Sequence, residues 1–165
     1  MNNEIIALID VLEAQRDIYR GLITLSEQKK EAILAGKVNQ LDRLVKDEQE
    51  PLTRLRELER RRKSELEKLA ARLKIPAADI KLHDVLAVAP ANIKNRLQTV
   101  QEELTTALKS QMTINEVVKK LLESRLEYIS FMMDMNTGDY TNSYNAEAGE
   151  NRPQKPVTRI IDLGV

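Results

Sequence analysis

The longest uninterrupted hydrophobic pattern in the chain lies between residues 90 and 135, where no glycine occurs and no proline follows Pro90. Apolar residues recur there at steps of three and four, the spacing that places side chains on one face of an α-helix. The pattern predicts one amphipathic helix, roughly 65–70 Å long at ~1.5 Å per residue. Its seam consists of Ile93, Leu97, Val100, Leu104, Ala107, Ile114, Val118, Leu121, Tyr128 and Met132.

Near the end of this helix the apolar surface becomes wider than one stripe, because Val117, Phe131 and several leucines and methionines join it. One neighbouring helix rarely covers such a width, so we expect another protein to dock there. The expected contact strip consists of Val118, Leu121, Leu122, Leu126, Ile129, Met132 and Met133. Methionine suits surfaces that accept varied apolar partners, but it is equally common as core filler. We assign the upstream Met112 to the core.

Two further helices are predicted before Pro76. The first runs from about residue 3 to residue 34 and ends at Gly36, which suits the left-handed position beyond a helix. The second has Asn39 as its expected N-cap and ends before Pro76, since a residue preceding proline avoids the helical region. Pro51 lies inside it, and we expect a kink rather than two helices because the leucine stripe resumes in phase. The short loop makes the two helices antiparallel neighbours.

A short helix or turn is predicted for residues 79–89. Four of its apolar side chains are expected to pack under one end of the bundle: Leu82, Val85, Leu86 and Val88. The predicted fold is all-α, an elongated antiparallel helical bundle or coiled coil of three main helices with a short connecting helix. Residues 1–135 form this bundle domain. Residues 136–165 form an extended, flexible C-terminal tail, because its first part is too polar to order itself. In its apolar ending, VTRIIDLGV, we expect Ile160, Ile161 and Leu163 to dock against an apolar surface, a groove shared with another ligand being one candidate.

The amino-acid composition limits the classes of function that the chain can have. Lys+Arg and Asp+Glu both number 26, so the basic surplus that is typical of nucleic-acid binders is missing. The chain has no cysteine, which leaves no disulfide framework and no cysteine-based metal site. Its start lacks the features of a signal peptide, and no apolar run reaches the ~18–20 residues that span a bilayer. We therefore expect a cytoplasmic protein, with no nucleic-acid partner and no membrane insertion.

The sequence also lacks a recognisable catalytic, cofactor-binding or metal-binding constellation. His83 is the only histidine and has no glutamate three residues before it, which a di-iron bundle requires. Gly36–Lys37 lacks the second glycine of a phosphate-binding loop. We expect a protein that is not an enzyme and has no cofactor. The run Arg60–Lys63 is interpreted as a solvated helix face, because successive residues point ~100° apart, and a nucleic-acid-associated role for it is retained as an alternative.

Two blocks of the chain carry a family resemblance. The first is LSEQKKEAILAGKVNQLDRLVKDEQEPLTRLRELERRR, with Leu41, Leu44, Val45, Glu48, Gln49, Leu52, Leu55, Leu58, Glu59 and Arg62 in the matching positions. The second is QMTINEVVKKLLESRLEYI, with Asn115, Leu121, Leu122, Leu126, Tyr128 and Ile129. Over about residues 1–135 the chain resembles the FlgN family of flagellar export chaperones. The ending VTRIIDLGV is similar to endings of Gram-positive-type members, whereas Pro51 departs from the pattern.

The resemblance implies a cytoplasmic chaperone that covers amphipathic C-terminal helical segments of hook-associated (hook–filament junction) proteins, prevents their premature aggregation or assembly, and hands them to the flagellar type III export gate. A monomer and a homodimer are both compatible with it. The alternative from another class is a structural or tethering coiled-coil protein, which self-associates through its long helices and has no groove for a client.

Overall fold

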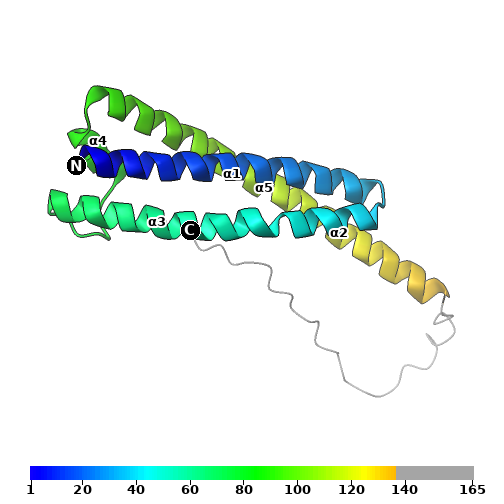
Figure 1. Cartoon of the computed structure of the whole chain (residues 1–165). Coiled ribbons are helices and arrows are strands. Elements are labelled where there is room, and N and C mark those ends of the chain that lie inside the picture. The colour runs from blue at the N-terminus through cyan, green and yellow to red at the C-terminus, as the bar shows by residue number, and fades with distance from the viewer. Residues whose placement is uncertain (137–165) are drawn as a thin grey trace, which may run out of the picture. The chain divides into compact units, whose positions relative to one another are not determined.

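The computed structural model describes residues 1–136, all of whose regular elements are helices. They are α1 (Asn2–Leu34), α2 (Val38–Asp47), α3 (Gln49–Leu73), α4 (Leu82–Val88) and α5 (Ala91–Asn136) (Figure 1). The helices pack as a bundle, so the predicted all-α class is confirmed. The chain divides into two compact units, Met1–Glu127 and Tyr128–Val165. The tail and its docking residues Ile160, Ile161 and Leu163 lie outside the described residues.

Helix α1 runs antiparallel to α2 and α3, as Figure 1 shows. The start of α1 contacts the end of α3, and the end of α1 contacts the junction of α2 and α3, which shows that the helices are antiparallel. Polar contacts join Glu4 to Arg72 at 2.6 Å, Gln15 to Glu59 at 3.2 Å and Lys29 to Glu48 at 2.7 Å. The predicted antiparallel hairpin is therefore present, with α1 as one arm and α2–α3 as the other.

Helix α5 pairs with α1 in the parallel direction within the first unit. Four cross-helix contacts rise together along both helices. They join Glu13 to Arg96 at 2.7 Å, Arg16 to Glu103 at 2.6 Å, Ser26 to Asn115 at 3.1 Å and the Leu34 carbonyl to Arg125 at 2.9 Å. Helix α1 contacts both α3 and α5 along its length, so it is the central helix of this unit.

The core lies where α1, α3, α4 and α5 meet, and its members come from all four helices. They are Ile5, Leu8, Ile9, Leu12, Leu69, Val85, Leu97 and Val100. The spacing of these residues in α1 and α5 is the predicted helical one. In α4, Leu82, Val85 and Leu86 pack on this core as expected, but Val88 is exposed, so its predicted burial is wrong. Val88 is the last residue of α4, at the point where the chain turns towards α5.

The turn between α1 and α2 is built around a left-handed glycine. Gly36 has φ +68°, and the Gly36 and Lys37 amides donate to the carbonyls of Ile33 and Ala32. This pair of bonds satisfies the last carbonyls of a helix and is the arrangement that favours glycine at this position. The predicted N-cap of the next helix is wrong: Lys37 holds the N-cap position and Asn39 lies in the first turn of α2.

The predicted single kinked helix around Pro51 is also wrong in detail, because α2 and α3 are separate helices with Glu48 between them. Glu48 itself keeps helical angles, with φ −73° and ψ −18°. Its amide donates to Leu44 and its carbonyl accepts from Leu52, so bonds of helical spacing flank the break. Pro51 has no N–H to give to the Asp47 carbonyl, which explains why the interruption falls one turn before it.

Candidate partner-binding site

The partner-binding strip predicted from the sequence begins near the point where α1 ends. There the Arg125 guanidinium donates a 2.9 Å hydrogen bond to the Leu34 carbonyl, the last helical residue of α1. A carbonyl in the last turn of a helix has no intrahelical donor, so Arg125 satisfies a group that would otherwise need water. This contact ties α5 to the end of α1.

Within the first unit, exposure increases along the strip. Val118 is buried, Leu121 and Leu122 are half-buried, and Leu126 is 65% exposed. Exposure increases because α1 ends at Leu34, which lies at the level of Arg125, and therefore has no residue that covers α5 beyond that level. Leu126 therefore lies on α5 just past the last α1 residue that contacts this helix.

The described part of the second unit, residues 128–136, continues α5. Ile129 is 52% exposed, Met133 is 62% exposed, and Met132 is exposed as well. At ~100° per residue, Leu122 and Leu126 fall on one stripe of the helix in the first unit, with Leu121 beside it. Within residues 128–136, Ile129 and Met133 likewise fall on one stripe, with Tyr128 and Met132 beside it.

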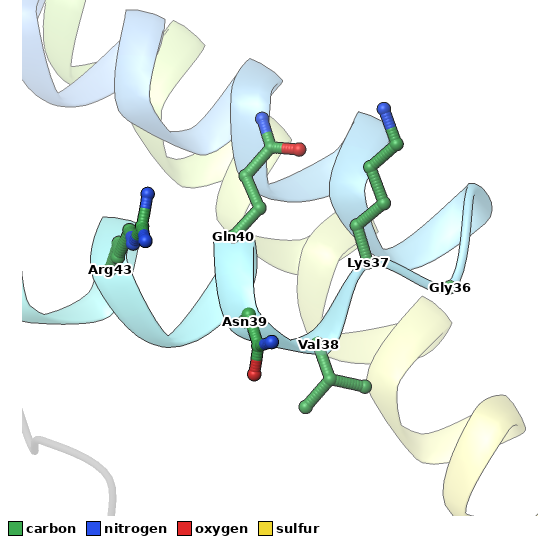
Figure 2. Close-up of a pocket in the computed structure, with 6 residues that line it drawn as sticks. All are labelled: Gly36, Lys37, Val38, Asn39, Gln40 and Arg43. Atoms are coloured by element: carbon green, nitrogen blue, oxygen red, sulfur yellow. The ribbon is translucent and has the colours of Figure 1, made fainter.

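Two exposed apolar residues at the α1–α2 turn were not predicted from the sequence. Leu34 and Val38 are both largely exposed and flank the turn between α1 and α2. In Figure 2, Val38 and Asn39 point to one side of α2, whereas Lys37, Gln40 and Arg43 point to the other.

An open hollow of about 530 Å³ lies over this turn, lined by Gly36, Lys37, Val38, Asn39, Gln40 and Arg43 (Figure 2). All six residues are exposed. It is an open surface of mixed polar and apolar character that carries the two cationic side chains Lys37 and Arg43.

A second hollow, of about 400 Å³, lies among α1, α3, α4 and α5. Its lining is mostly aliphatic and consists of Leu8, Leu12, Gln15, Tyr19, Glu59, Arg62, Leu66, Ile80, Leu82, Val85, Gln101, Leu104 and Leu108. We call it the inter-helix groove. It lies within the first unit, apart from the strip at the end of α5.

One end of the inter-helix groove is polar. Arg62 donates to both oxygens of Glu59, at 2.5 and 2.9 Å, and Gln15 donates to the same carboxylate at 3.2 Å. The Arg62 hydrogen bond is the main cause that lowers the pKa of Glu59. Burial, with a smaller contribution from Glu59, raises the pKa of the neighbouring Tyr19 phenol. The groove therefore presents one carboxylate and one guanidinium, both charged at neutral pH, next to an apolar floor.

The middle of the α1–α5 seam contains a buried polar layer. Gln111 donates to the Ser26 hydroxyl at 3.3 Å and to the Asn115 amide oxygen at 3.0 Å, and Ser26 donates to Asn115 at 3.1 Å. Gln111 takes the inward position here, so its neighbour Met112 points outward and is 68% exposed. The predicted assignment of Met112 to the core is wrong for this reason.

The basic run Arg60–Lys63 divides between two environments. Arg62 is half-buried and faces Glu59 in the groove, whereas Arg60, Arg61 and Lys63 are exposed. Within residues 1–136, no group of His, Asp or Glu side chains is arranged to hold a metal ion. Among the helices of the same described residues, none has the length and apolar character needed to cross a membrane.

These observations define a class: a helical bundle with exposed apolar side chains on its last helix, α5. A comparison with family models matches residues 1–152 to the family described as FlgN protein. The chain therefore belongs to the FlgN family, a family of flagellar export chaperones rather than of enzymes, and the predicted family is confirmed.

One curated relative matches over most of its length. It is the uncharacterized protein YvyG of Bacillus subtilis strain 168, which is 27% identical over 160 residues, covering 90% of this chain and 94% of that protein. No solved structure matches the chain.

Proposed function

We propose that this protein is a cytoplasmic chaperone of the flagellar type III secretion system that binds the amphipathic C-terminal helices of hook-associated (hook–filament junction) proteins and passes them to the export gate. The client helix lies along the strip of α5, on Leu121, Leu122, Leu126, Ile129, Met132 and Met133. Membership of the FlgN family supports the class of function. The exposed apolar surface supports the position of the site.

The observation that carries the proposal is the exposure of Leu126, Ile129 and Met133, at 65%, 52% and 62%. Each apolar side chain that moves fully from water into a contact contributes about 1.5–3 kcal/mol, and a half-exposed one about half of that. The six side chains of the strip give a gross gain of roughly 5–9 kcal/mol, and the cost of association reduces it, so the apolar contact favours weak and reversible binding. An affinity of this size protects a client helix and still allows its release.

Val118 and the turn residues have separate roles in the proposal. Val118 is buried, so it seats the strip on the bundle rather than facing the client. Leu34 and Val38 lie at the turn whose Leu34 carbonyl accepts from Arg125, and they extend the apolar contact to the α1–α2 turn.

The test is a pair of charge substitutions, Leu126→Glu and Met133→Glu, with Met112→Glu as the matched control. Met112 is an exposed apolar residue of the same helix outside the strip, so the control introduces the same charge on a similar surface. The probe is a purified C-terminal helical segment of each hook-associated protein from the same organism, measured by isothermal titration calorimetry. Circular dichroism verifies that each variant keeps its helix content.

We expect at least a tenfold loss of affinity for each strip variant, because a buried, unpaired carboxylate costs more than ~1.4 kcal/mol. Met112→Glu should bind as the unchanged chain does. Undiminished binding in both folded strip variants would contradict the proposed site. Light scattering then separates a chaperone from a tethering coiled coil: a defined complex with the client supports the first, and a stable dimer that no client segment binds supports the second.

A further inference from the structure

The inter-helix groove is an apolar surface that the described helices leave open. Leu66 of α3 and Leu104 and Leu108 of α5 are half-buried there, above the buried Leu8 and Leu12 of α1. Concave apolar surfaces of this size, with a few polar groups at one end, are typical of binding sites. The groove is separate from the strip on α5, so an occupant of the groove does not depend on a client at that strip.

We propose that the C-terminal segment of the same chain, residues 157–165, occupies this groove, with Ile160, Ile161 and Leu163 on its apolar floor. The segment VTRIIDLGV is the apolar ending of a stretch that is otherwise polar. Bound there, it completes the side of the bundle that α3 and α5 leave uncovered. The protein would then supply its own occupant for a surface that is otherwise open to foreign helices.

The chain is long enough for this contact in any placement of the second unit. Within the first unit, the helix from Leu104 to Glu127 measures roughly 35 Å at ~1.5 Å per residue. The helical residues 128–136 add or subtract at most about 13 Å by the same rise. Residues 137–156 can extend to ~65 Å at about 3.3 Å per residue. The remaining reach exceeds the distance to the groove even when residues 128–136 point directly away from it.

Charge complementarity favours the same occupant. The polar end of the groove carries Glu59 and Arg62 side by side, and the segment carries one cation, Arg159, and one anion, Asp162. Each segment charge can therefore meet an opposite charge at the groove while the apolar side chains lie on Leu66, Leu104 and Leu108.

The experiment uses the full chain and exploits its lack of cysteine. A nitroxide label on Gly164→Cys reports where the segment binds and leaves Ile160, Ile161 and Leu163 unchanged. Methyl NMR signals of Leu66, Leu104 and Leu108 are compared with the label oxidised and reduced, and Leu34 at the far end of α1 serves as the reference. We expect strong loss of signal at the three groove leucines and little at Leu34.

Two tail variants make the result specific. The double substitution Ile160→Asp/Ile161→Asp should restore the groove signals, whereas Asn142→Asp/Asn145→Asp adds the same charge outside the segment and should leave the loss intact. Loss confined to α5 beyond Leu126, or loss without a preferred site, would overturn the proposal. A mixture of labelled-tail chains with isotope-labelled, label-free chains tests for a second copy: groove broadening that persists in that mixture would also overturn the intrachain contact.

Discussion

Leu97 and Leu126 are leucines of the same helix, yet the first is 0% exposed and the second is 65% exposed. Leu97 lies where α1, α3 and α4 close around α5, among Ile5, Ile9, Leu69 and Val85. Leu126 follows Arg125, the residue that meets the last turn of α1. The difference between the two positions is therefore a difference in neighbours and not in the residue or in the helix that holds it.

This comparison separates two meanings of an apolar stripe. A stripe shows that side chains gain free energy on leaving water, but it does not say which chain provides the cover. At Leu97 the cover comes from the same chain, and the gain stabilises the fold. At Leu126 the gain is available to a partner, which is why we place the client there.

The largest expected effect is a change in stability, which tests whether the chain itself covers Leu97 but not Leu126. Leu97→Ala should lower the free energy of unfolding by about 2–5 kcal/mol, because it removes transfer energy and leaves a cavity in a closed core. Leu126→Ala should change it by less than about 0.5 kcal/mol, as exposed sites usually do. Urea unfolding followed by circular dichroism measures both. Equal destabilisation by the two substitutions would mean that Leu126 is covered in the free protein.

The next effect concerns a covered charge. Lys29 is buried, and its ammonium group donates to both oxygens of Glu48 at 2.7 and 2.8 Å, joining α1 to the junction of α2 and α3. Lys29→Met leaves the Glu48 carboxylate without its partner, and we expect a loss of about 3 kcal/mol in unfolding free energy.

The matched control for that pair is Lys29→Met/Glu48→Leu. It removes both charges from a mostly buried contact and should recover most of the loss, because two apolar groups need no solvation. If the double variant were no more stable than Lys29→Met, the stabilisation would come from the packing of the Lys29 stem rather than from the ion pair.

Much of the fold follows from local sequence. Gly36 ends α1 because it adopts a positive φ, and Pro76 follows the end of α3, both by short-range backbone rules. The all-α class and the spacing of Leu97 and Val100 follow from the helical step. The position of the break near Pro51 was harder to predict, since Glu48 keeps helical angles and only one carbonyl loses its donor.

Long-range contacts were not predictable in the same way. Lys29, near the end of α1, is buried against Glu48, which lies 19 residues later between α2 and α3. Met112 was expected in the core, but Gln111 occupies the inward position because Ser26 and Asn115 satisfy its amide donors. Which of two adjacent residues faces inward depends on the partner helix, and a single helix does not encode that partner.

A smaller effect is expected at the buried polar layer, which lies between the closed core and the exposed end of α5. Ser26→Ala removes a hydroxyl that accepts from Gln111 and donates to Asn115, so we expect a loss of about 1 kcal/mol. Thr24→Ala is the control, because its hydroxyl bonds the Arg20 carbonyl on an exposed surface. Thermal unfolding should show a lower midpoint for the first variant only. Equal shifts would indicate an effect of helix propensity instead.

The smallest effect lies on the exposed edge of the α1–α5 seam, beside the closed core. Arg96 donates to Glu13 at 2.7 and 2.8 Å, and this hydrogen bond is the main cause that lowers the pKa of Glu13. Arg96→Gln should cost less than about 1 kcal/mol at neutral pH, since solvent screens a partly exposed pair. Because the pKa of Glu13 is lower in the folded state, its ionised carboxylate stabilises the fold at pH values above the unfolded pKa of ~4.3. This contribution to the free energy of unfolding disappears as the pH falls through the folded pKa. The difference between the variant and the unchanged chain, measured by urea unfolding, should therefore shrink on acidification. A difference that stays constant from neutral to acid pH would show that Arg96 stabilises this edge by packing, as Leu97 stabilises the core, and not by charge.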